Sequence, residues 1–238
     1  VLAETLASLL LIDLIKPGHP VIFGPWPFVT DLRTGSFSGG SGEEALMSAA
    51  SAQITNHYGL ASSVGAGMTD SKSPDAQAGY EKGITVVMAA LAGCNNVSES
   101  SGMMASLMGY SFESLVIDNE MLGMVMRTVR GIEVNEETLS YRAIKDTVEG
   151  EGHFLRDPQT LSLMKTEYLY PTLADRSTQE EWEAEGSPDM RQRAEQRARE
   201  ILNSHYPVYI DDATDKKVRD AFPIEISRDV IKPTKDRF

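Results

Sequence analysis

The chain has 238 residues, 41% of them hydrophobic, which is enough for one large domain or two small ones with a packed core. Its 22 Lys and Arg are scattered and stand against 35 Asp and Glu, so the net charge of −13 argues against a nucleic-acid partner. Cys94 is the single cysteine, which excludes an internal disulfide and makes the reducing cytoplasm the expected location.

The first predicted element is a helix over residues 2–15. This segment is apolar, but it contains Glu4 and Asp13, follows no basic stretch and is too short to span a bilayer, so we expect no membrane partner. We expect a buried amphipathic helix that ends at the Lys-Pro-Gly of residues 16–18. Because the chain opens inside a helix pattern without an initiator Met, we expect a fragment of a longer protein.

Short apolar or small-residue runs, which predict strands, then alternate with longer segments that predict helices. In chain order these are a strand at 20–24, a helix from a Ser41/Glu44 capping box to about Tyr58, a strand at 60–66, a helix from Ser73-Pro74 to about Ala92, a strand at 95–98, and a helix at 112–130 capped by Ser111. This alternation is typical of βαβ units with a parallel sheet, so we expect an α/β domain over residues 1–134.

From residue 135 onward the pattern changes to charged helical segments. Glu195 and Arg199, for example, have the i, i+4 spacing of an ion pair on one helix face. We expect residues 135–238 to form a mainly helical C-terminal extension, which packs on the first domain and keeps its charged side chains in solvent.

Each predicted strand is followed by polar or aromatic residues. These are Trp26, Phe28, Asp31 and Arg33 after the first strand, Asp70, Ser71 and Lys72 after the second with Tyr80 on the next helix, and Glu99 after the third. The carboxyl ends of parallel strands are where α/β folds place their sites. Aromatic rings attract a quaternary ammonium, and a carboxylate supplies the opposite charge. The pattern therefore predicts a site for a small organic cation.

Simpler interpretations of the same residues stay open. Trp26 and Phe28 stand among prolines, where they could simply close one end of a barrel. The TDSKSPD segment could be only a turn and a helix cap, with Asp70 in an Asx turn and Asp75 as a first-turn acid. Lys72 shows no sequence feature that requires burial, so a solvated lysine is the simplest interpretation.

The motifs of several common enzyme classes are absent from the sequence. No GxSxG, HExxH, P-loop or strand-linked GxGxxG occurs, so acyl transfer, zinc proteolysis and nucleotide binding lose their usual signals. No Cys/His cluster suggests a zinc site, and no metal ligand is predicted. The Met-rich segment from Met103 to Met126 is interpreted as core packing.

Three long strings of the sequence resemble the trimethylamine methyltransferase family. They are DSKSPDAQAGYEK, which ends at Lys82, NNVSESSGMMASLMGYSFESLVIDNEMLG, which begins at Asn95, and GHFLRDPQTLSLMKTEYLYP, which begins at Gly152. The likeness covers nearly the whole chain and implies a TIM (β/α)8 barrel. Since complete members of the family are roughly twice as long, the resemblance implies that this chain is the C-terminal half.

The resemblance also implies a reaction. The family moves a methyl group from a methylated amine to the cobalt of a corrinoid, which a separate protein carries, so this chain is expected to bind no cofactor directly. Its archaeal founders contain pyrrolysine, whereas every residue here is standard. The sequence therefore resembles the branch that demethylates quaternary amines such as glycine betaine, and the loop near Lys72 is the expected neighbourhood of the missing residue.

On this interpretation the residues after the strands take distinct roles. Trp26, Phe28 and Tyr80 would form the cation site, Asp70, Lys72 and Glu99 the catalytic polar rim, and Arg33 or Lys72 would hold a substrate carboxylate. Two other functions stay open, a binding module for a cationic osmolyte and a half barrel used only in assembly. Because half a barrel exposes two strand edges, a homo-oligomer is also expected.

Overall fold

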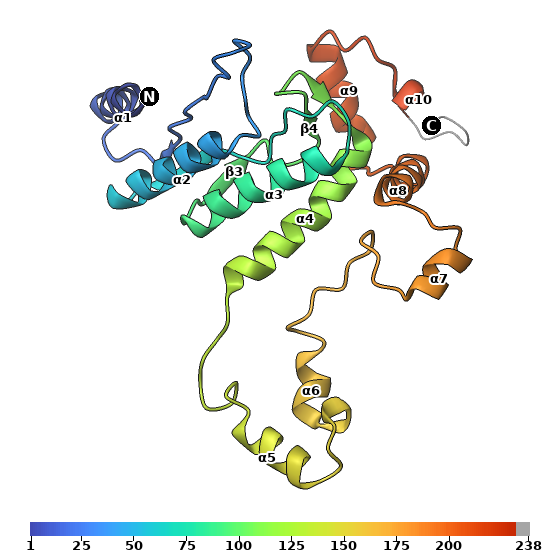
Figure 1. Ribbon diagram of the computed structural model, residues 1–238. Helices are drawn as coiled ribbons and strands as arrows, with labels where there is room; N and C mark the ends of the chain where they lie inside the picture. The colour runs from blue at the N-terminus through green and yellow to red at the C-terminus, as the bar shows by residue number, and fades with distance from the viewer. Residues whose placement is uncertain (232–238) are drawn as a thin grey trace.

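The computed structural model describes residues 1–231, in which helices and short strands alternate at first and helices follow (Figure 1). The elements are α1 (Leu2–Ile15), β1 (Ile22–Phe23), α2 (Gly42–His57), β2 (Ala61–Gly65), α3 (Ala76–Leu91), β3 (Asn96–Ser98), β4 (Met103–Met104), β5 (Gly109–Tyr110), α4 (Phe112–Arg130), α5 (Tyr141–Glu149), a 3-10 turn (Phe154–Arg156), α6 (Pro158–Leu163), α7 (Gln179–Ala184), α8 (Met190–Ser204), α9 (Asp212–Ala221) and α10 (Arg228–Ile231). The predicted α/β class is confirmed.

The central sheet is parallel and has the strand order β1-β2-β3. Ile22 lies opposite Ala61, and Val64 lies opposite Val97. The three predicted strands are therefore present, each within its predicted range. The antiparallel β4–β5 hairpin was not predicted, because two-residue strands leave no periodic signal in the sequence.

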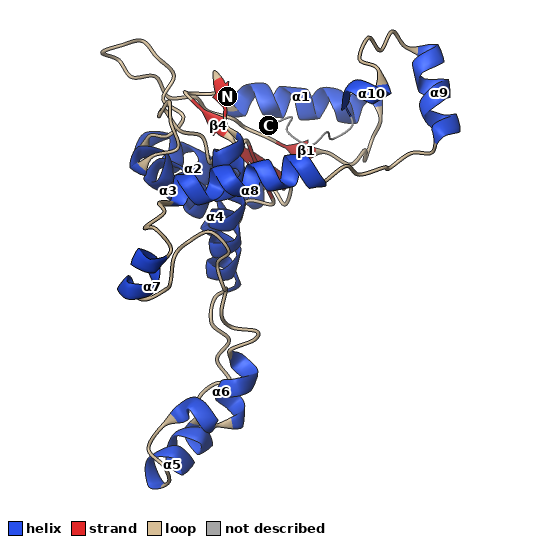
Figure 2. Ribbon diagram, turned by 90° about the vertical axis from the view of Figure 1, so that its right-hand side faces the viewer, coloured by secondary structure: helices blue, strands red, loops and turns tan. Residues whose placement is uncertain are grey.

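Helices α2, α3 and α4 pack against one face of this sheet (Figures 1 and 2). The core between them contains Ala52 from α2, Val64 from β2, Val86 and Ala89 from α3, and Val125 from α4. Small residues dominate this core, so the helices approach the strands closely. Burial of these apolar side chains is the main favourable term that fixes the three βα units together.

The opposite face of the sheet carries small and polar side chains. Asn96 Nδ2 donates hydrogen bonds to Ser63 Oγ at 3.1 Å and to Ser98 Oγ at 3.2 Å, and the two hydroxyls are 3.3 Å apart. Ile22 on the edge strand of this face is exposed. Small residues leave this face open, whereas the core face is closed by helices.

The predicted helix starts need two corrections. Helix α3 begins at Ala76 and not at Pro74, because Asp75 is its N-cap and accepts a hydrogen bond from the Ala78 N–H at 3.0 Å. The Ser41 capping box is only half formed. Ser41 Oγ accepts from the Glu44 N–H at 3.2 Å, but the Glu44 carboxylate turns inward and accepts from the Val29 N–H at 3.1 Å.

Helix α1 forms as predicted, but the expectation that it is buried is wrong. None of its residues is buried, and Leu14 and Ile15 are among the most exposed apolar side chains of the helix. Its apolar residues do not gather on one side, so one packed face could not cover them all. The helix touches the rest of the described chain through its start, where Leu2 lies beside Pro25 and Met47.

The Met-rich segment is only partly core. Met104 is buried and Met121 packs against the core cluster, as predicted. Met108, Met124 and Met126 are exposed. The prediction that the whole segment packs inside is therefore wrong, because Met108 lies in the β4–β5 turn and the outer side of α4 faces away from the sheet.

The C-terminal helices divide into a packed part and a projecting part. Helix α8 lies against α4, with Ala194 and Ala198 buried and the predicted Glu195–Arg199 ion pair on its outer side at 2.9 Å. In contrast to the expected packed extension, α5 and α6 project away from the sheet at the far end of α4 (Figures 1 and 2). We call residues 132–165 the arm.

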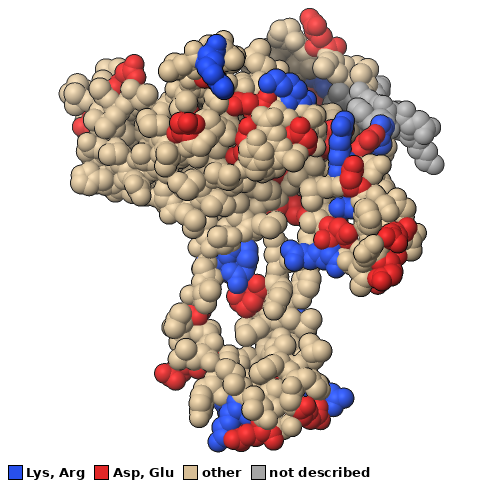
Figure 3. All heavy atoms as spheres, viewed as in Figure 1, with Lys and Arg blue, Asp and Glu red and all other residues tan. Residues whose placement is uncertain are grey.

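The base of the arm is fastened to α4 by ion pairs and backbone bonds. Glu167 lies 3.1 Å from both Arg127 and Arg130, and Arg127 Nε donates to the Glu167 carbonyl at 2.8 Å. The returning chain is held by Glu120, whose carboxylate accepts from the N–H groups of residues 172–174 at 2.6–2.7 Å. The arm therefore has a defined direction, and it joins the core through two narrow connections (Figure 3).

Candidate active site

The candidate site lies at the carboxyl end of the sheet, where the loops after β1 and β2 meet. Trp26 follows β1 and lies against Gly65 at the end of β2, so that a Cβ added to Gly65 would be 3.6 Å from indole Cε3. A Cβ added to Gly24 would be 3.5 Å from indole Nε1. Glycines at both strand ends thus leave room for the Trp26 ring on the open face of the sheet.

Asp70, in the loop after β2, joins three loops. Its Oδ2 accepts from the Ser38 hydroxyl at 2.8 Å, and its Oδ1 accepts from the Gly39 N–H at 3.0 Å and from the Ser106 hydroxyl at 2.7 Å. Ser38 and Gly39 belong to the loop before α2, and Ser106 lies at the tip of the β4–β5 hairpin. Because both oxygens are engaged, Asp70 positions the loops around the site.

The Glu81 side chain on α3 forms hydrogen bonds with the same loop. Its Oε2 accepts from the Thr69 hydroxyl at 2.5 Å and from the Asp70 N–H at 2.8 Å, and its Oε1 accepts from Gln77 Nε2 at 2.8 Å. Gly40 packs directly on this carboxylate, and a side chain at residue 40 would collide with it. The Glu81 carboxylate therefore determines where the Asp70 loop can lie.

The tip of the β4–β5 hairpin is strained. Ala105, Ser106 and Leu107 have φ values of 51°, 55° and 71°, in the left-handed region that non-glycine residues avoid. Backbone bonds of 2.8 Å from the Ala105 N–H to the Ser71 carbonyl and from the Ser106 N–H to the Thr69 carbonyl hold this tip on the loop after β2. Strain of this kind persists where the surroundings enforce it, and it is enriched at functional sites.

A buried ion pair fixes the other side of the hairpin. Lys82 Nζ lies 2.5 Å from Asp118 Oδ2, with 1% and 3% of the two residues exposed. Asp118 also accepts from the Gly102 N–H at 2.7 Å and from the Ser114 hydroxyl at 3.0 Å. The pair thus connects α3, α4 and the loop that leads from β3 into the hairpin.

Glu44 is a second buried carboxyl group near the sheet end. It accepts from the Val29 N–H and lies 3.5 Å from the Ser48 hydroxyl, which in turn donates to the Gly65 carbonyl at 2.9 Å. Burial raises the pKa of Glu44 to about 7, and the bonds from Val29 and Ser48 oppose this shift. Glu44 therefore holds a proton over part of the physiological pH range.

This raised pKa predicts a pH-dependent stability. The Glu44 carboxyl group binds its proton more tightly in the folded protein than in the unfolded one. Its contribution to the free energy of unfolding is therefore fully present below pH 4.5 and is lost as the pH rises to about 7. The Glu44→Gln variant should remove this loss, so that its stability relative to the wild type increases by up to ~3 kcal/mol between pH 4.5 and 7.5. Urea unfolding at several pH values measures the difference, and parallel curves for both proteins would contradict it.

The other predicted aromatic residues lie at the surface. Phe28 is exposed and packs edge-on against Phe37, with ring centroids 4.9 Å apart. Tyr80 lies on α3 and is exposed. Trp26 is therefore the predicted ring that lies on the sheet itself, and a shared cation site for all three rings stays a prediction.

The remaining charged residues are spread around the rim. Arg33 pairs with Asp31 at 2.7 Å in an exposed loop, and this hydrogen bond holds the pKa of Asp31 well below its ordinary value. Lys72 is exposed, and its Nζ donates to the Asp70 carbonyl at 2.6 Å. Glu99 directly follows β3 with a left-handed φ of 63°. The Lys72 side chain therefore lies next to the Asp70 backbone, whereas Arg33 is paired with Asp31.

The sequence analysis did not predict Lys82, Asp118, Glu81 or Glu44 as site residues. A signal for the first two was available, since Lys82 shares a helical face with Ala78 and Ala89, and Asp118 lies one turn after Ser114 on the buried side of α4. A charge on a buried helix face predicts a buried partner. The burial of Glu44 was not predicted, because Glu at the third residue of a helix is also the usual mark of a capping box.

The comparison with protein families shows to which family the chain belongs. The model of the family described as "Trimethylamine methyltransferase (MTTB)" matches residues 1–224. The chain belongs to the trimethylamine methyltransferase family. This confirms the resemblance on which the sequence analysis relied.

Individual relatives within this family carry two kinds of name. The chain is 39% identical over 217 residues to a glycine betaine methyltransferase of Desulfitobacterium hafniense. The aligned region covers 91% of this chain and 45% of that protein. It is also 39% identical over 209 residues to the trimethylamine methyltransferase MttB of Methanosarcina thermophila, which covers 88% of this chain and 43% of that protein. The chain thus spans less than half the length of these curated relatives.

Two further findings concern the part of the chain that the structure describes. Within residues 1–231, no three His, Cys, Asp or Glu side chains are grouped so that they could hold a metal ion. Over the same residues, no helix combines the length and the apolar character that a membrane crossing requires.

Proposed function

We propose that this member of the trimethylamine methyltransferase family takes part in the transfer of a methyl group from a methylated or quaternary amine to the cobalt of a corrinoid on a separate protein. The observation that carries the proposal is the position of the Trp26 ring, which lies on the carboxyl end of the sheet. The loops beside it are held in place by the hydrogen bonds of Asp70 and by the strained hairpin. The names of the relatives support the substrate class.

We further propose that the sheet is part of a TIM barrel and that residues 1–134 contribute later βα units to it. Three parallel strands with helices on one face support this, as does the open opposite face with its small polar side chains. In such a barrel the open face would point inward, and the loops that carry Trp26 and Asp70 would surround the mouth.

Methyl transfer from a quaternary ammonium needs no general acid or base. The C–N bond of a quaternary ammonium breaks with its electron pair left on nitrogen, so a neutral tertiary amine departs without a proton, while the acceptor supplies the pair for the new bond to carbon. The corrinoid, when its carrier protein presents it, supplies this nucleophile. The chain's part is orientation of methyl group and acceptor in line, which contributes about 7–11 kcal/mol in well-aligned reactions.

The nature of this step determines which residues should touch the nitrogen. The positive charge on nitrogen disappears during the reaction, so a carboxylate in contact with it would stabilise the ground state more than the transition state. An aromatic ring binds the cation more weakly than a carboxylate does, so it stabilises the ground state less. We therefore assign Trp26 to the ammonium, with Phe28 and Tyr80 as further candidates, and keep Asp70 and Glu99 as outer carboxylates. Arg33 and Lys72 are candidates for a substrate carboxylate.

The proposal is tested on the full-length protein with its corrinoid partner. A series of methylated amines that includes glycine betaine and trimethylamine is added, and the absorbance change of the corrinoid is followed. An absorbance change with at least one amine is expected. If no amine produces a change but calorimetry detects binding, the chain belongs to a cation-binding protein without this chemistry, and the proposed function is overturned.

The role of Trp26 gives a prediction for the same assay. Trp26→Ala should raise KM for the preferred amine about 10-fold, because a cation–π contact of about 0.5–2 kcal/mol is lost, and Trp26→Phe should recover part of it. Trp182, the other tryptophan of the chain, lies on α7, and Trp182→Ala is the matched control with an unchanged KM. Equal KM values for wild type and Trp26→Ala would contradict this assignment.

A further inference from the structure

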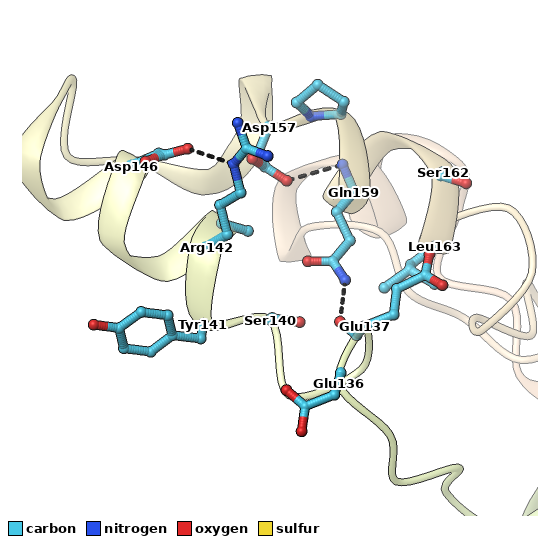
Figure 4. Close-up of a pocket in the computed structure, with 12 residues that line it drawn as sticks. Glu136, Glu137, Ser140, Tyr141, Arg142, Asp146, Asp157, Gln159, Ser162 and Leu163 are labelled. Carbon is cyan, nitrogen blue, oxygen red and sulfur yellow. Dashed lines mark hydrogen bonds and ion pairs between the residues drawn. The ribbon is translucent and has the colours of Figure 1, made fainter.

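The acid side chains of the arm and those of the sheet end differ in burial. An open hollow of about 790 Å³ lies between α5 and α6 of the arm (Figure 4). There Asp146 lies 3.6 Å from Arg142 with 63% of its side chain exposed, and Asp157 caps α6 by accepting from the Gln159 N–H at 2.9 Å. Solvent screens charges in such an open position. Glu44, at the sheet end, is only 1% exposed, so its hydrogen bonds and its charge act at full strength.

Glu44 connects the Trp26 segment to the residue on which the Trp26 ring lies. Its Oε2 accepts from the Val29 N–H at 3.1 Å, three residues after Trp26. Its Oε1 lies 3.5 Å from Ser48 Oγ, and this hydroxyl donates to the Gly65 carbonyl at 2.9 Å. Gly65 is the residue against which the indole packs. One carboxyl group on α2 thus reaches both the segment that carries the ring and the strand end beside it.

The segment between Trp26 and Val29 is stiff, so a bond at Val29 affects the position of the ring. Pro25 and Pro27 flank Trp26, and both are buried. A proline fixes its own φ and restricts the residue before it to extended conformations. The Val29 carbonyl also accepts from the Ser38 N–H at 2.9 Å. The Trp26 ring therefore moves with the backbone that Glu44 holds.

The number of hydrogens in this cluster favours a neutral Glu44. A hydroxyl carries one hydrogen, and the Gly65 carbonyl takes that of Ser48 at 2.9 Å. An ionised carboxylate would compete for this hydrogen and draw the hydroxyl to about 2.5–2.7 Å, whereas the distance from Glu44 Oε1 to Ser48 Oγ is 3.5 Å. A neutral Glu44 can present its own proton to Ser48 Oγ while Oε2 still accepts from Val29. The raised pKa of Glu44, about 7, agrees with this geometry.

Burial, and not a neighbouring charge, raises the pKa of Glu44. The charged groups on the elements packed around it have other partners or are exposed. They are Asp31 and Arg33, which pair with each other, Asp70 and Glu81, which accept bonds from the loops of the site, Lys72, which donates to the Asp70 carbonyl, Lys82, which pairs with Asp118, the N-terminal amine, which pairs with Glu4, and Glu43 and His57 at the two ends of α2, which are exposed. A pH dependence that disappears in Glu44→Gln is therefore assigned to Glu44 itself.

We propose that neutral Glu44 is a positioning residue for the amine, which holds the Trp26 segment against the end of β2 and releases it when its proton passes to solvent. The proposal rests on the proposed function, in which the Trp26 ring contacts the ammonium. The ionised carboxylate takes the Ser48 hydrogen, so the Gly65 carbonyl loses its partner, and a charge in this buried place favours opening to water. The ring and the strand end then separate more easily, and a quaternary amine binds less tightly.

The first test measures the binding of tetramethylammonium, a cation without a titrating group, to the full-length protein by calorimetry at pH 6 and pH 8. The wild-type Kd should rise about 3- to 10-fold, which is the effect of one lost hydrogen bond. Glu44→Gln, whose amide copies the neutral acid, should bind as tightly at pH 8 as at pH 6. Ser48→Ala should bind weakly at both pH values. Glu43→Gln, at the exposed acid next in sequence, is the matched control and should keep the wild-type profile.

Three results of this test overturn the proposal. A wild-type Kd that is the same at both pH values shows that the proton of Glu44 does not affect the amine. A rise that is equal in wild type and Glu44→Gln places the titrating group elsewhere. Tighter wild-type binding at pH 8 shows that the Glu44 charge attracts the cation directly instead of positioning the ring.

Hydrogen exchange of the full-length protein tests the same connection without an amine. The peptide of residues 25–30 is identical in wild type and Glu44→Gln, so its intrinsic exchange cancels in the ratio of the two rates. This ratio should rise about 10-fold from pH 6 to pH 8, because the enclosed carboxyl group, with its pKa of about 7, loses its proton over this range. An unchanged ratio overturns the proposal even if amines bind. If the ratio rises but tetramethylammonium does not bind at either pH, the assignment of Trp26 to the ammonium fails, whereas the hold of Glu44 on the Trp26 segment stands.

Discussion

Replacing the buried Lys82 with methionine should destabilise the folded protein by about 3–5 kcal/mol. The variant leaves the Asp118 carboxylate buried with only the Ser114 hydroxyl and the Gly102 N–H as partners. An uncompensated charge in a buried site is costly, and the loss of one partner of a buried pair is therefore far worse than the loss of a surface ion pair. Urea unfolding of the full-length protein measures the change.

Two further variants identify the cause. Lys72→Met makes the same substitution at an exposed lysine of the neighbouring loop and should change the stability by less than about 0.5 kcal/mol. The double variant Lys82→Met with Asp118→Leu removes both charges and should recover most of the stability, because apolar pairs of similar volume replace buried ion pairs well. A double variant as unstable as the single one would contradict the charge argument.

Replacing Asp70 with alanine should lower kcat/KM for methyl transfer about 100-fold. The side chain holds Ser38, Gly39 and Ser106, so its loss frees the loop before α2 and the strained hairpin tip together. A misplacement of about 1 Å in a group that orients a substrate already costs this much. The assay is the corrinoid absorbance change described above, with stability measured in parallel.

The control for this variant is Asp75→Ala. Asp75 is a carboxylate of the same loop, but its bonds stay within the loop and the start of α3, and the Ala78 N–H and the Ser71 hydroxyl hold its pKa below the ordinary value. Its removal should cost about 1 kcal/mol of stability, as for other N-caps, with little effect on kcat/KM. Equal losses of activity in both variants would show that Asp70 has no special part in arranging the site.

Local patterns predicted most of the elements of the first 130 residues. The helix at Phe112–Arg130 has its N-cap at Ser111, and Gly59 and Gly93 follow the ends of α2 and α3 with left-handed φ values of 67° and 87°. These features depend on residues close in sequence, so one sequence is enough to predict them. The start of α3 was two residues off because Pro74 and Asp75 both mark helix starts, and only the side-chain bond of Asp75 decides between them.

The site residues show the limit of such reasoning. The sequence analysis selected Asp70 because it follows a strand, which is a local property. Its partners Ser38 and Ser106 lie 32 and 36 residues away, and no spacing rule connects them. The predicted shared cation site needed the relative positions of three loops, and the structure places Trp26 on the sheet while Phe28 and Tyr80 are exposed.

The sequence by itself determined the α/β class, the order of the three parallel strands and of the helices that follow them, and the family, because periodicity, caps and long family strings depend on residues close together in the chain. Only the tertiary structure decided that Lys82 and Asp118 form a buried pair, that Glu44 is enclosed, and that α5 and α6 project as an arm. The physical reason is that burial, and with it the pKa of a carboxyl group or the exposure of an apolar side chain, depends on contacts between distant segments.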